Sequence, residues 1–236
     1  MKTRQKIRKA LIIISFLLFP ITIFYFSPYL IVVGSFEGVI VGSFITFAAM
    51  FIASLFIGRL FCGWVCPGAG LQECLFTVKD KKVSQRYNFV KFLIWSPWML
   101  LIAFAAYRAG GYRSFDPLFH TTYGISVANP WMYIIYYSII LLVLVPALAV
   151  GSRSFCHHIC WMSPFMIIGR KAGNLLKTTS LRLRSDKKRC IDCLICNKNC
   201  PMSLDVHKMV KDGNMENPEC ILCFNCIDNC PKKVIQ

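Results

Sequence analysis

The chain has 236 residues, a hydrophobic content of 56% and a formal net charge of +16. Its mean hydropathy of +0.54 excludes an ordinary soluble enzyme or carrier, because the apolar residues gather in long segments without charge. The basic residues flank these segments. Lipid headgroups therefore account for the charge, and we expect membrane lipids rather than nucleic acid as partners.

Four uncharged segments occupy most of the first two thirds of the chain. They cover residues 10–36, 38–58, 92–107 and 117–152. A spanning helix needs roughly 20 apolar residues, and the helices of a soluble bundle would show polar faces that these segments lack. The sequence therefore predicts a membrane α-helical fold with four transmembrane helices in residues 1–168. The first segment is too long for a signal peptide, so we expect it to remain as an anchor.

Lysine and arginine are concentrated before the first segment, between the second and third, and after the fourth. By the positive-inside rule, both termini face the cytoplasm. We therefore expect a multi-pass protein of a prokaryotic cytoplasmic (inner) membrane. Because the cytosol is reducing, the thirteen cysteines are better explained as metal ligands or redox thiols than as disulfides.

A short pattern, R-x-F-C-x3-C, follows the second segment and again the fourth. Two helices followed by the same pattern, twice over, indicate a duplicated unit made of two similar hairpins. The two cysteines of each copy lie one helical turn apart and share a face, so four sulfurs converge if the two units meet. These cysteines are Cys62 and Cys66 in the first copy and Cys156 and Cys160 in the second.

Three uses of these four cysteines stay open: a shared metal or cluster site, redox-active thiol pairs, or simple packing. Arg59 and Arg153 precede the two pairs, and a nearby arginine lowers the pKa of a thiol. Alternatively, both arginines reach outward to lipid headgroups. His157 and His158 stand inside the second copy and could ligate a metal, or only form hydrogen bonds.

The loop between the third and fourth segments contains two residues that could handle protons, Asp116 and His120. A carboxylate and a histidine can exchange protons near neutral pH. The alternative for Asp116 is a cap on the turn before Pro117.

Residues 169–186 form a predicted basic linker to a C-terminal domain in residues 187–236. This domain carries the run C-x2-C-x2-C-x3-C-P twice, 30 residues apart. The run binds iron–sulfur clusters in bacterial ferredoxins, where the fourth cysteine of each run ligates the other cluster. Zinc is disfavoured because its sites usually combine two separated C-x2-C halves. The sequence therefore predicts an α+β ferredoxin domain with two [4Fe–4S] clusters. Cluster 1 would be held by Cys190, Cys193, Cys196 and Cys230, and cluster 2 by Cys220, Cys223, Cys226 and Cys200.

The four segments, the two C-x3-C motifs and the double ferredoxin run resemble those of the NapH-type membrane polyferredoxins. The motif Cys62-Gly-Trp-Val-Cys66-Pro67 carries much of this resemblance, while the second copy departs from it with Trp161 in the place of proline. The superfamily includes electron-transfer subunits linked to periplasmic nitrate reduction, the core of nitrous-oxide reductase regulators, and a cytochrome oxidase assembly factor that reduces copper. The resemblance covers nearly the whole chain and implies electron transfer, with quinol chemistry in some members.

We therefore predict a membrane-bound iron–sulfur protein that relays electrons between the quinone pool, or a membrane partner, and a redox partner protein. It would be a subunit of a multi-subunit oxidoreductase system rather than a stand-alone enzyme. Its cofactors would be two [4Fe–4S] clusters, with a further metal or cluster at the C-x3-C motifs and a quinone as additional candidates. Two alternatives stay open: a copper or thiol reductase or assembly factor that uses the C-x3-C motifs, and a redox-sensing regulatory protein.

Overall fold

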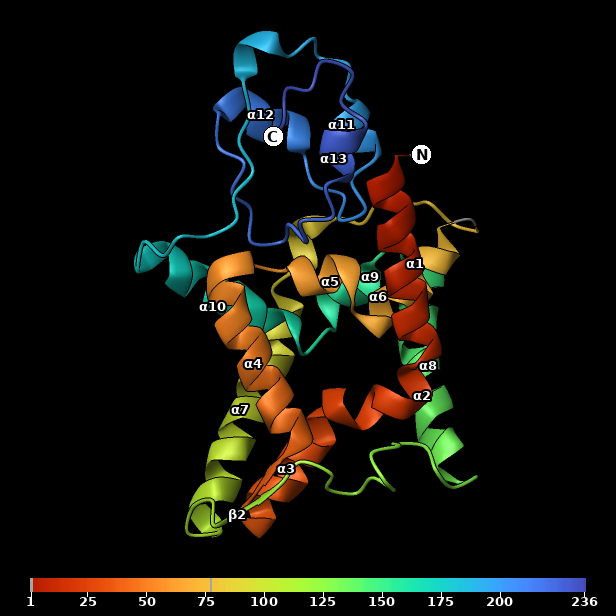
Figure 1. Cartoon of the computed structure of the whole chain (residues 1–236), viewed down its shortest axis with the longest axis vertical. Coiled ribbons are helices and arrows are strands. Elements are labelled where there is room, and N and C mark those ends of the chain that lie inside the picture. Colours follow the sequence, from red (N-terminus) through yellow and green to blue (C-terminus); the bar gives the residue numbers. More distant parts are fainter. Residues whose placement is uncertain (1, 77) are drawn as a thin grey trace.

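The computed structural model describes residues 2–76 and 78–236. Figure 1 shows long helices in its lower part, a layer of short helices above them, and residues 187–236, the cluster domain, at the top. The N-terminal end of α1 (Thr3–Leu17) lies beside the cluster domain. There Arg4 Nη2 and Gln5 Nε2 donate to the carboxylate of Asp228 at 2.8 Å and 2.6 Å. The N-terminus and the cluster domain therefore share one end of the molecule.

The first apolar segment is broken into several short helices. After α1 come α2 (Phe19–Thr22), η1 (Ile23–Phe26) and α3 (Pro28–Glu37). The chain bends by 59° after α1. Pro20 and Pro28 stand in the first turns of α2 and α3, where the missing N–H has no helical partner to lose.

Three further apolar helices follow: α4 (Gly42–Ile57), α7 (Val90–Arg108) and α8 (Met132–Ala149). Two short strands, β1 (Val39–Val41) and β2 (Ser114–Asp116), pair in parallel with Ile40 opposite Phe115. This pair lies at the end of the molecule away from the cluster domain (Figure 1). It ties together the loops that follow α3 and α7.

Two helices are long and apolar enough to cross a membrane. The number rises to three if α1 and the bent continuation Phe19–Phe26 (α2 and η1) together form one span. The two are α8 and the helix that runs from Gln85 through α7. Only 17% and 11% of their most apolar windows are buried, as expected of helices that face lipid. α4 is apolar but has 16 residues. The structure is thus consistent with membrane association through two or three spans, and the predicted number of four is not confirmed.

The layer of short helices consists of α5 (Leu60–Trp64), α6 (Pro67–Leu75), α9 (Ser154–His158) and α10 (Ser163–Leu175). α10 packs closely on α4, because a Cβ at Gly169 would lie 1.9 Å from the Oγ of Ser54. α10 runs to Leu175, so it includes the first seven residues of the segment 169–186 that the sequence predicts to be a linker. The extended stretch begins only after α10.

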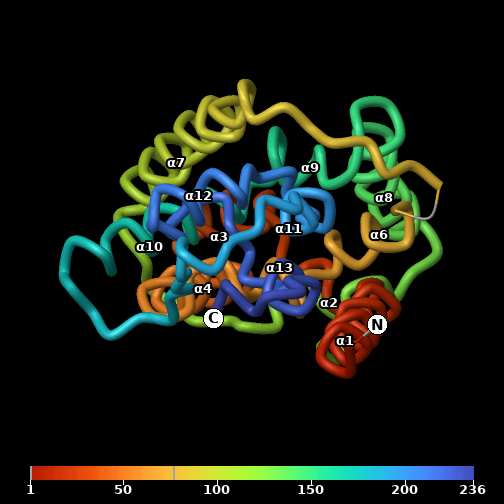
Figure 2. The backbone as a smooth tube through the Cα atoms, turned by 90° about the horizontal axis from the view of Figure 1, so that it is seen from above, coloured from red at the N-terminus to blue at the C-terminus, as the bar shows by residue number. Residues whose placement is uncertain are grey.

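The cluster domain is built from short turns and helices around its cysteines. Its helices are η3 (Lys187–Arg189), α11 (Ile195–Lys198), α12 (Val206–Asp212) and α13 (Asn225–Asp228). The short helix η2 (Gln85–Tyr87) lies outside this domain, just before α7. A single bridge joins Ser185 to Ile235, and the described part of the domain has no further strand pairing. Seen from above, α11, α12 and α13 lie over the middle of the molecule and α1 stands at its edge (Figure 2).

Candidate electron-transfer site

The eight cysteines of the cluster domain form two groups of four around two cavities. Each cavity combines three cysteines of one run with the last cysteine of the other run, which is the grouping that the ferredoxin pattern predicts. One cavity is lined by Cys190, Cys193, Cys196 and Cys230, and the other by Cys200, Cys220, Cys223 and Cys226. We call these quartet 1 and quartet 2; that each holds a cluster stays a prediction.

The backbone of the two runs repeats as closely as their sequence. Asp192 and Leu222, at equivalent positions, have φ of 58° and 47°, and Leu194 and Phe224 have φ of 55° and 59°. Positive φ is uncommon for residues other than glycine. Here one positive-φ residue turns the chain in each of the two gaps between the first three cysteines of a run. The three sulfurs of that run can therefore reach the same cavity.

The cysteines of the C-x3-C motifs form a third group of four, the membrane-edge quartet, in the layer of short helices. Cys62, Cys66, Cys156 and Cys160 are each 4–5% exposed. Burial raises the pKa of Cys66, and its three neighbours in the quartet raise it further. Gln72 Nε2 donates to the Sγ of Cys156 at 3.2 Å, and Arg153 Nη1 donates to the carbonyl of Cys62 at 3.4 Å, so the two repeats are in contact at their cysteine motifs.

The distances between the sulfurs distinguish these quartets from a site for a single metal ion. A tetrahedral thiolate site with Zn–S bonds of about 2.3 Å needs sulfurs about 3.8 Å apart. Among the described residues, the one group of three potential ligands within 4.8 Å of one another is Cys190, Asp192 and His207. Among the described residues, no quartet contributes three sulfurs to such a group, so none of the quartets has the compact spacing of a single-ion site.

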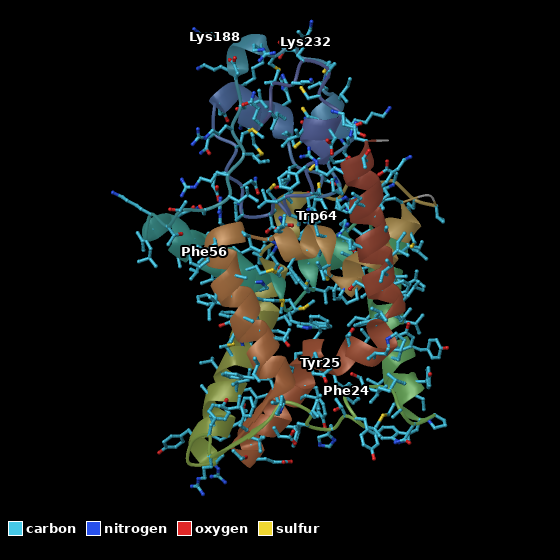
Figure 3. The ribbon with its side chains drawn as sticks, viewed as in Figure 1. Phe24, Tyr25, Phe56, Trp64, Lys188 and Lys232 are labelled. Carbon is cyan, nitrogen blue, oxygen red and sulfur yellow. The ribbon has the colours of Figure 1, made fainter. Side chains whose placement is uncertain are left out.

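The loop that carries quartet 2 packs directly on the first C-x3-C motif. Trp64 Nε1 donates to the carbonyl of Leu222 at 3.0 Å, and Figure 3 shows Trp64 just beneath the cluster domain. A Cβ at Gly63 would lie 2.4 Å from the carbonyl oxygen of Ile221 and 3.5 Å from the amide of Cys223. Only glycine allows this approach. Quartet 2 and the membrane-edge quartet are therefore joined by direct packing.

Buried ion pairs surround this contact. Glu219, beside quartet 2, accepts from Arg59 Nη1 at 2.6 Å and from Lys91 Nζ at 2.5 Å. Glu73 of α6 accepts from Arg8 Nη2 at 2.5 Å and from Arg153 Nη2 at 2.8 Å. Burial acts to raise the pKa of both carboxyl groups, but the paired cations outweigh it and hold each pKa below its ordinary value: Arg8 and Arg153 at Glu73, and Arg59 and Lys91 at Glu219.

The two arginines of the motifs thus do not reach lipid headgroups. Arg59 and Arg153 are 1% and 0% exposed. Arg59 acts to lower the pKa of Cys62, as expected from the sequence, but burial has the larger effect and the pKa is raised. Neither acid was identified from the sequence, because no spacing rule connects Glu73 or Glu219 to the arginines with which they pair.

The two histidines of the second motif lie at the edge of the quartet. His157 is buried, its Nδ1 lies 2.9 Å from Asn88 Oδ1, and burial lowers its pKa to about 4. His158 packs against the ring of Tyr87. Neither joins a group of three potential ligands in the described chain, and metal binding by them stays a prediction.

The two candidate proton-handling residues have different surroundings. Asp116 is exposed and caps a turn, since its Oδ1 accepts from the Leu118 amide at 3.0 Å. His120 is also exposed, but it lines a large apolar cavity of about 590 Å³ in the helical part. Side chains from residues 19–30 and from α8 form most of its wall. Its other end reaches the C-x3-C motifs at Pro67, Gly68 and Trp161.

Comparison with known proteins gives the class of the chain. The family model of a "4Fe-4S binding domain" matches residues 39–84 and again residues 131–174, and a "4Fe-4S dicluster domain" matches residues 182–231. The double match, with one C-x3-C motif in each part, agrees with the duplicated unit expected from the sequence.

Two curated relatives are distantly similar over 199 residues each. An uncharacterized protein of Methanocaldococcus jannaschii is 22% identical over 77% of this chain and 69% of its own length. The "Putative electron transport protein YccM" of Escherichia coli is 23% identical over 80% of this chain and 54% of its own length. No solved structure matches. The chain is therefore an iron–sulfur protein with ferredoxin-type 4Fe–4S domains and apolar helices suited to a membrane.

Proposed function

We propose that this chain relays electrons between the quinone pool and a redox partner protein, as a membrane-bound subunit of an oxidoreductase system. Its path would run through quartets 1 and 2, the membrane-edge quartet and the apolar cavity. The name of the E. coli relative, an electron transport protein, supports the same class of function. The resemblance to NapH-type polyferredoxins supports the quinone as the membrane reactant.

One observation carries the proposal: the loop of quartet 2 is in van der Waals contact with the motif that begins the membrane-edge quartet. When bound, [4Fe–4S] clusters accept and release one electron at a time. Gly63 and Trp64 hold the two parts of the chain at a fixed, short separation. Without that contact the cluster domain would be a separate carrier attached by a linker.

The cavity beside the membrane-edge quartet suits a quinone. Binding sites for small molecules are mostly apolar with a few polar groups, and here Tyr29 and His120 supply the groups that can exchange protons. Oxidising one quinol releases two electrons, taken one at a time, and two protons. His120 would take up a proton on the side away from the cluster domain.

The cavity is tested by filling it. Gly68 lines the cavity, and a Cβ there would meet nothing within 4 Å, so the longer side chain of Gly68→Leu can start from this position and add bulk to the cavity. The full chain is reduced with dithionite under anaerobic conditions and mixed with a short-tailed quinone, and reoxidation is followed by the visible absorbance of the clusters. We expect Gly68→Leu to slow reoxidation by the quinone and to leave reoxidation by ferricyanide unchanged. Gly68→Ala is the matched control, and equal rates for both variants would contradict the quinone site.

The contact between the two parts is tested at Gly63. Gly63→Ala would push the loop of quartet 2 away from α5. We expect quinone reoxidation to fall by about 10-fold or more, the usual range for a change just outside a metal site. The EPR signals of the cluster domain should persist. An unchanged rate would show that electrons do not cross at this contact.

A copper-handling reductase is the second candidate, because the Sγ of Cys62 lies 3.8 Å from the Sδ of Met166. Thiolate and thioether sulfurs together favour Cu(I). This function predicts that Cu(II) reoxidises the reduced chain and that the double variant Cys62→Ser, Cys66→Ser abolishes that reaction. The relay predicts that the cavity variant Gly68→Leu leaves the reaction with Cu(II) unchanged.

A further inference from the structure

The two cysteine runs of the cluster domain are repeats, but only the second is packed against the helical part. In the second run, Ile221 is 2% exposed and Cys223 is buried, because this loop lies on Gly63. In the first run, the equivalent Ile191 is 54% exposed and Cys193 is exposed. The second repeat therefore shows how such a loop forms a contact, and the first repeat presents the same loop uncovered.

A second apolar position repeats this difference. Phe224 and Leu194 share a left-handed backbone, with φ of 59° and 55°, so their side chains leave the two loops in equivalent directions. The ring centroid of Phe224 lies 6.1 Å from that of Trp64 and 5.0 Å from the Cζ of Arg4. Leu194 is 51% exposed. Leu194 and Ile191, which both line the cavity of quartet 1, therefore stand in the open where their counterparts form contacts.

The end of the domain that meets the helical part is acidic. Residues 213–231, which contain the second run, include three acids and no lysine or arginine. All three acids, Glu216, Glu219 and Asp228, form ion pairs with cations that lie outside the domain. The established contact between the two parts is thus apolar in its centre and joins carboxylates of the domain to cations of the helical part.

The basic residues of the domain are on the elements that enclose quartet 1. Within residues 187–236, all of which the structure describes, the eight lysines and arginines are exposed and stand on η3, α11 and α12 and at positions 232 and 233. Of these eight, Lys211 alone forms an ion pair with a described residue, Asp192. Figure 3 shows Lys188 and Lys232 at the end of the molecule farthest from the long helices. The two ends of the domain therefore carry opposite charge.

The positive charge around quartet 1 remains when a cluster is counted. The acids on the same elements are Asp192, Asp205 and Asp212, so the eight cations exceed them by five. The charge of a bound group belongs in such a balance, and an oxidised [4Fe–4S] core with four thiolates contributes about −2. About three positive charges are then left at this end of the domain.

One equivalent position reverses its charge between the two runs. Asp228 in the second run accepts from Arg4 Nη2 at 2.8 Å, and the first run has the exposed Lys198 in its place. A partner that meets the first run in the same manner would present a carboxylate where the chain itself presents Arg4. Protein interfaces combine a buried centre with a polar rim, and charges of opposite sign across them steer association.

We propose that the outer face, formed by Ile191 and Leu194 with Lys188, Lys198 and Lys232, is the docking site of a small electron-carrier protein with an acidic surface. The inference rests on the proposed function and deepens it, because it names the class of the redox partner and the face that receives it. Docking here places the carrier beside quartet 1, while quartet 2 stays on the side of the helical part.

An anionic membrane surface is the other partner that a basic face could bind. The outer face lies beyond the layer of short helices, on the side opposite to most of α7 and α8 (Figure 1). A membrane that holds α7 and α8 therefore does not reach it. The exposed apolar side chains at its centre also favour a protein over a layer of headgroups.

The test is the association of the full chain, with its clusters and in a neutral detergent, with oxidised flavodoxin, a small acidic flavin carrier. We expect binding that weakens as salt is raised, because salt screens the attraction. Lys188→Glu with Lys232→Glu should slow association by about 10-fold or more at low salt. The matched control, Lys171→Glu with Lys177→Glu, makes the same change of net charge at exposed positions in and just after α10, and should leave the rate nearly unchanged. Equal rates for the two double variants would overturn the proposal.

The apolar centre is tested at Leu194. Leu194→Asn removes the apolar side chain, and asparagine accepts the left-handed backbone at this position, so the loop should keep its shape. We expect faster dissociation of flavodoxin and an unchanged salt dependence of association, because contacts made after the encounter act mainly on dissociation. An unchanged visible absorbance of the clusters shows that the variant is folded. An unchanged dissociation rate would then refute docking over Leu194.

The position of the carrier is tested by cross-linking. A carbodiimide joins a lysine amine of the chain to a carboxylate of flavodoxin as an amide, with loss of water, and mass spectrometry identifies the lysine. We expect Lys188, Lys198 and Lys232 among the cross-linked residues, and neither Lys171 nor Lys177. Cytochrome c, a small basic carrier, should not bind. Cross-links spread over both sets of lysines, equal binding of cytochrome c, or binding of anionic lipid vesicles but not of flavodoxin would overturn the proposal.

These measurements separate the inference from the proposed function. Binding of oxidised flavodoxin requires neither a quinone nor turnover. Binding at the outer face without reoxidation by the quinone would support the inference and refute the relay to quinone. Reoxidation by the quinone in a chain that does not bind flavodoxin would do the reverse.

Discussion

The cluster domain and the membrane-edge quartet assemble four cysteines in two different ways. In the cluster domain, six of the eight cysteines lie in two short loops whose positive-φ residues set the direction of the sulfurs. In the membrane-edge quartet, the two pairs are 94 residues apart in the sequence, and two repeated units that pack together bring their motifs into contact. The first arrangement depends on local backbone geometry, and the second depends on helix packing and buried ion pairs. The two assemblies should therefore fail under different perturbations.

The largest difference is expected when the clusters are removed. The cluster domain has helices of only 4, 7 and 4 residues, and a domain of this size rarely buries enough apolar surface to fold alone. Oxidation and chelation of iron should therefore unfold residues 187–236, because cofactor binding and folding are coupled. The long helices of the membrane part should stay folded. Limited proteolysis with mass spectrometry would then place new cuts after residue 187 and few before it, and a protected apo-domain would contradict this view.

The next largest effect is expected at the acid that joins the two regions. Glu219→Gln leaves Arg59 and Lys91 buried without their counter-ion, and breaking such a pair costs about 3–5 kcal/mol. The apparent free energy of unfolding can be measured in detergent by denaturant titration. Glu216→Gln is the matched control three residues away, since its side chain is 33% exposed and should cost less than about 1 kcal/mol. Equal losses for the two variants would show that the buried network does not stabilise the contact.

The two assemblies also differ in how much of each can be predicted from the sequence. Spacing alone groups the cysteines of quartets 1 and 2, because the turns that direct them are local and repeat at an offset of 30 residues. The repeated motif also predicts that Cys62 and Cys156 lie together. These features are periodic, and a periodic feature can be read from one sequence.

The rest of the site depends on contacts between distant segments. Glu73 and Glu219 are isolated acids in the sequence, and only the folded chain places each between two cations. The break of the first apolar segment could have been inferred from Pro20 and Pro28, but the direction of the bend depends on what packs beneath it. The apolar cavity has no sequence signal at all, because its wall combines residues from η1, α8 and both motifs.

The smallest effect is expected from the pH dependence of the outer ion pair. A hydrogen bond from Arg170 is the main cause that holds the pKa of Glu216 below its ordinary value, although partial burial opposes it. Because the pKa is lower in the folded state, the pair stabilises the protein above about pH 4.3, and this stabilisation is lost as the pH falls toward the folded-state pKa. The difference in apparent unfolding free energy between the unchanged chain and Glu216→Gln should thus be largest near neutral pH, stay below about 1 kcal/mol, and shrink below about pH 4.3. Denaturant titrations at about pH 7, 5 and 4 would measure it. A difference that grows on acidification would mean that the surroundings of Glu216 destabilise its carboxylate. The exposed pair of Glu216 would then differ from the buried pairs of Glu219 in the sign of its contribution to stability as well as in its size.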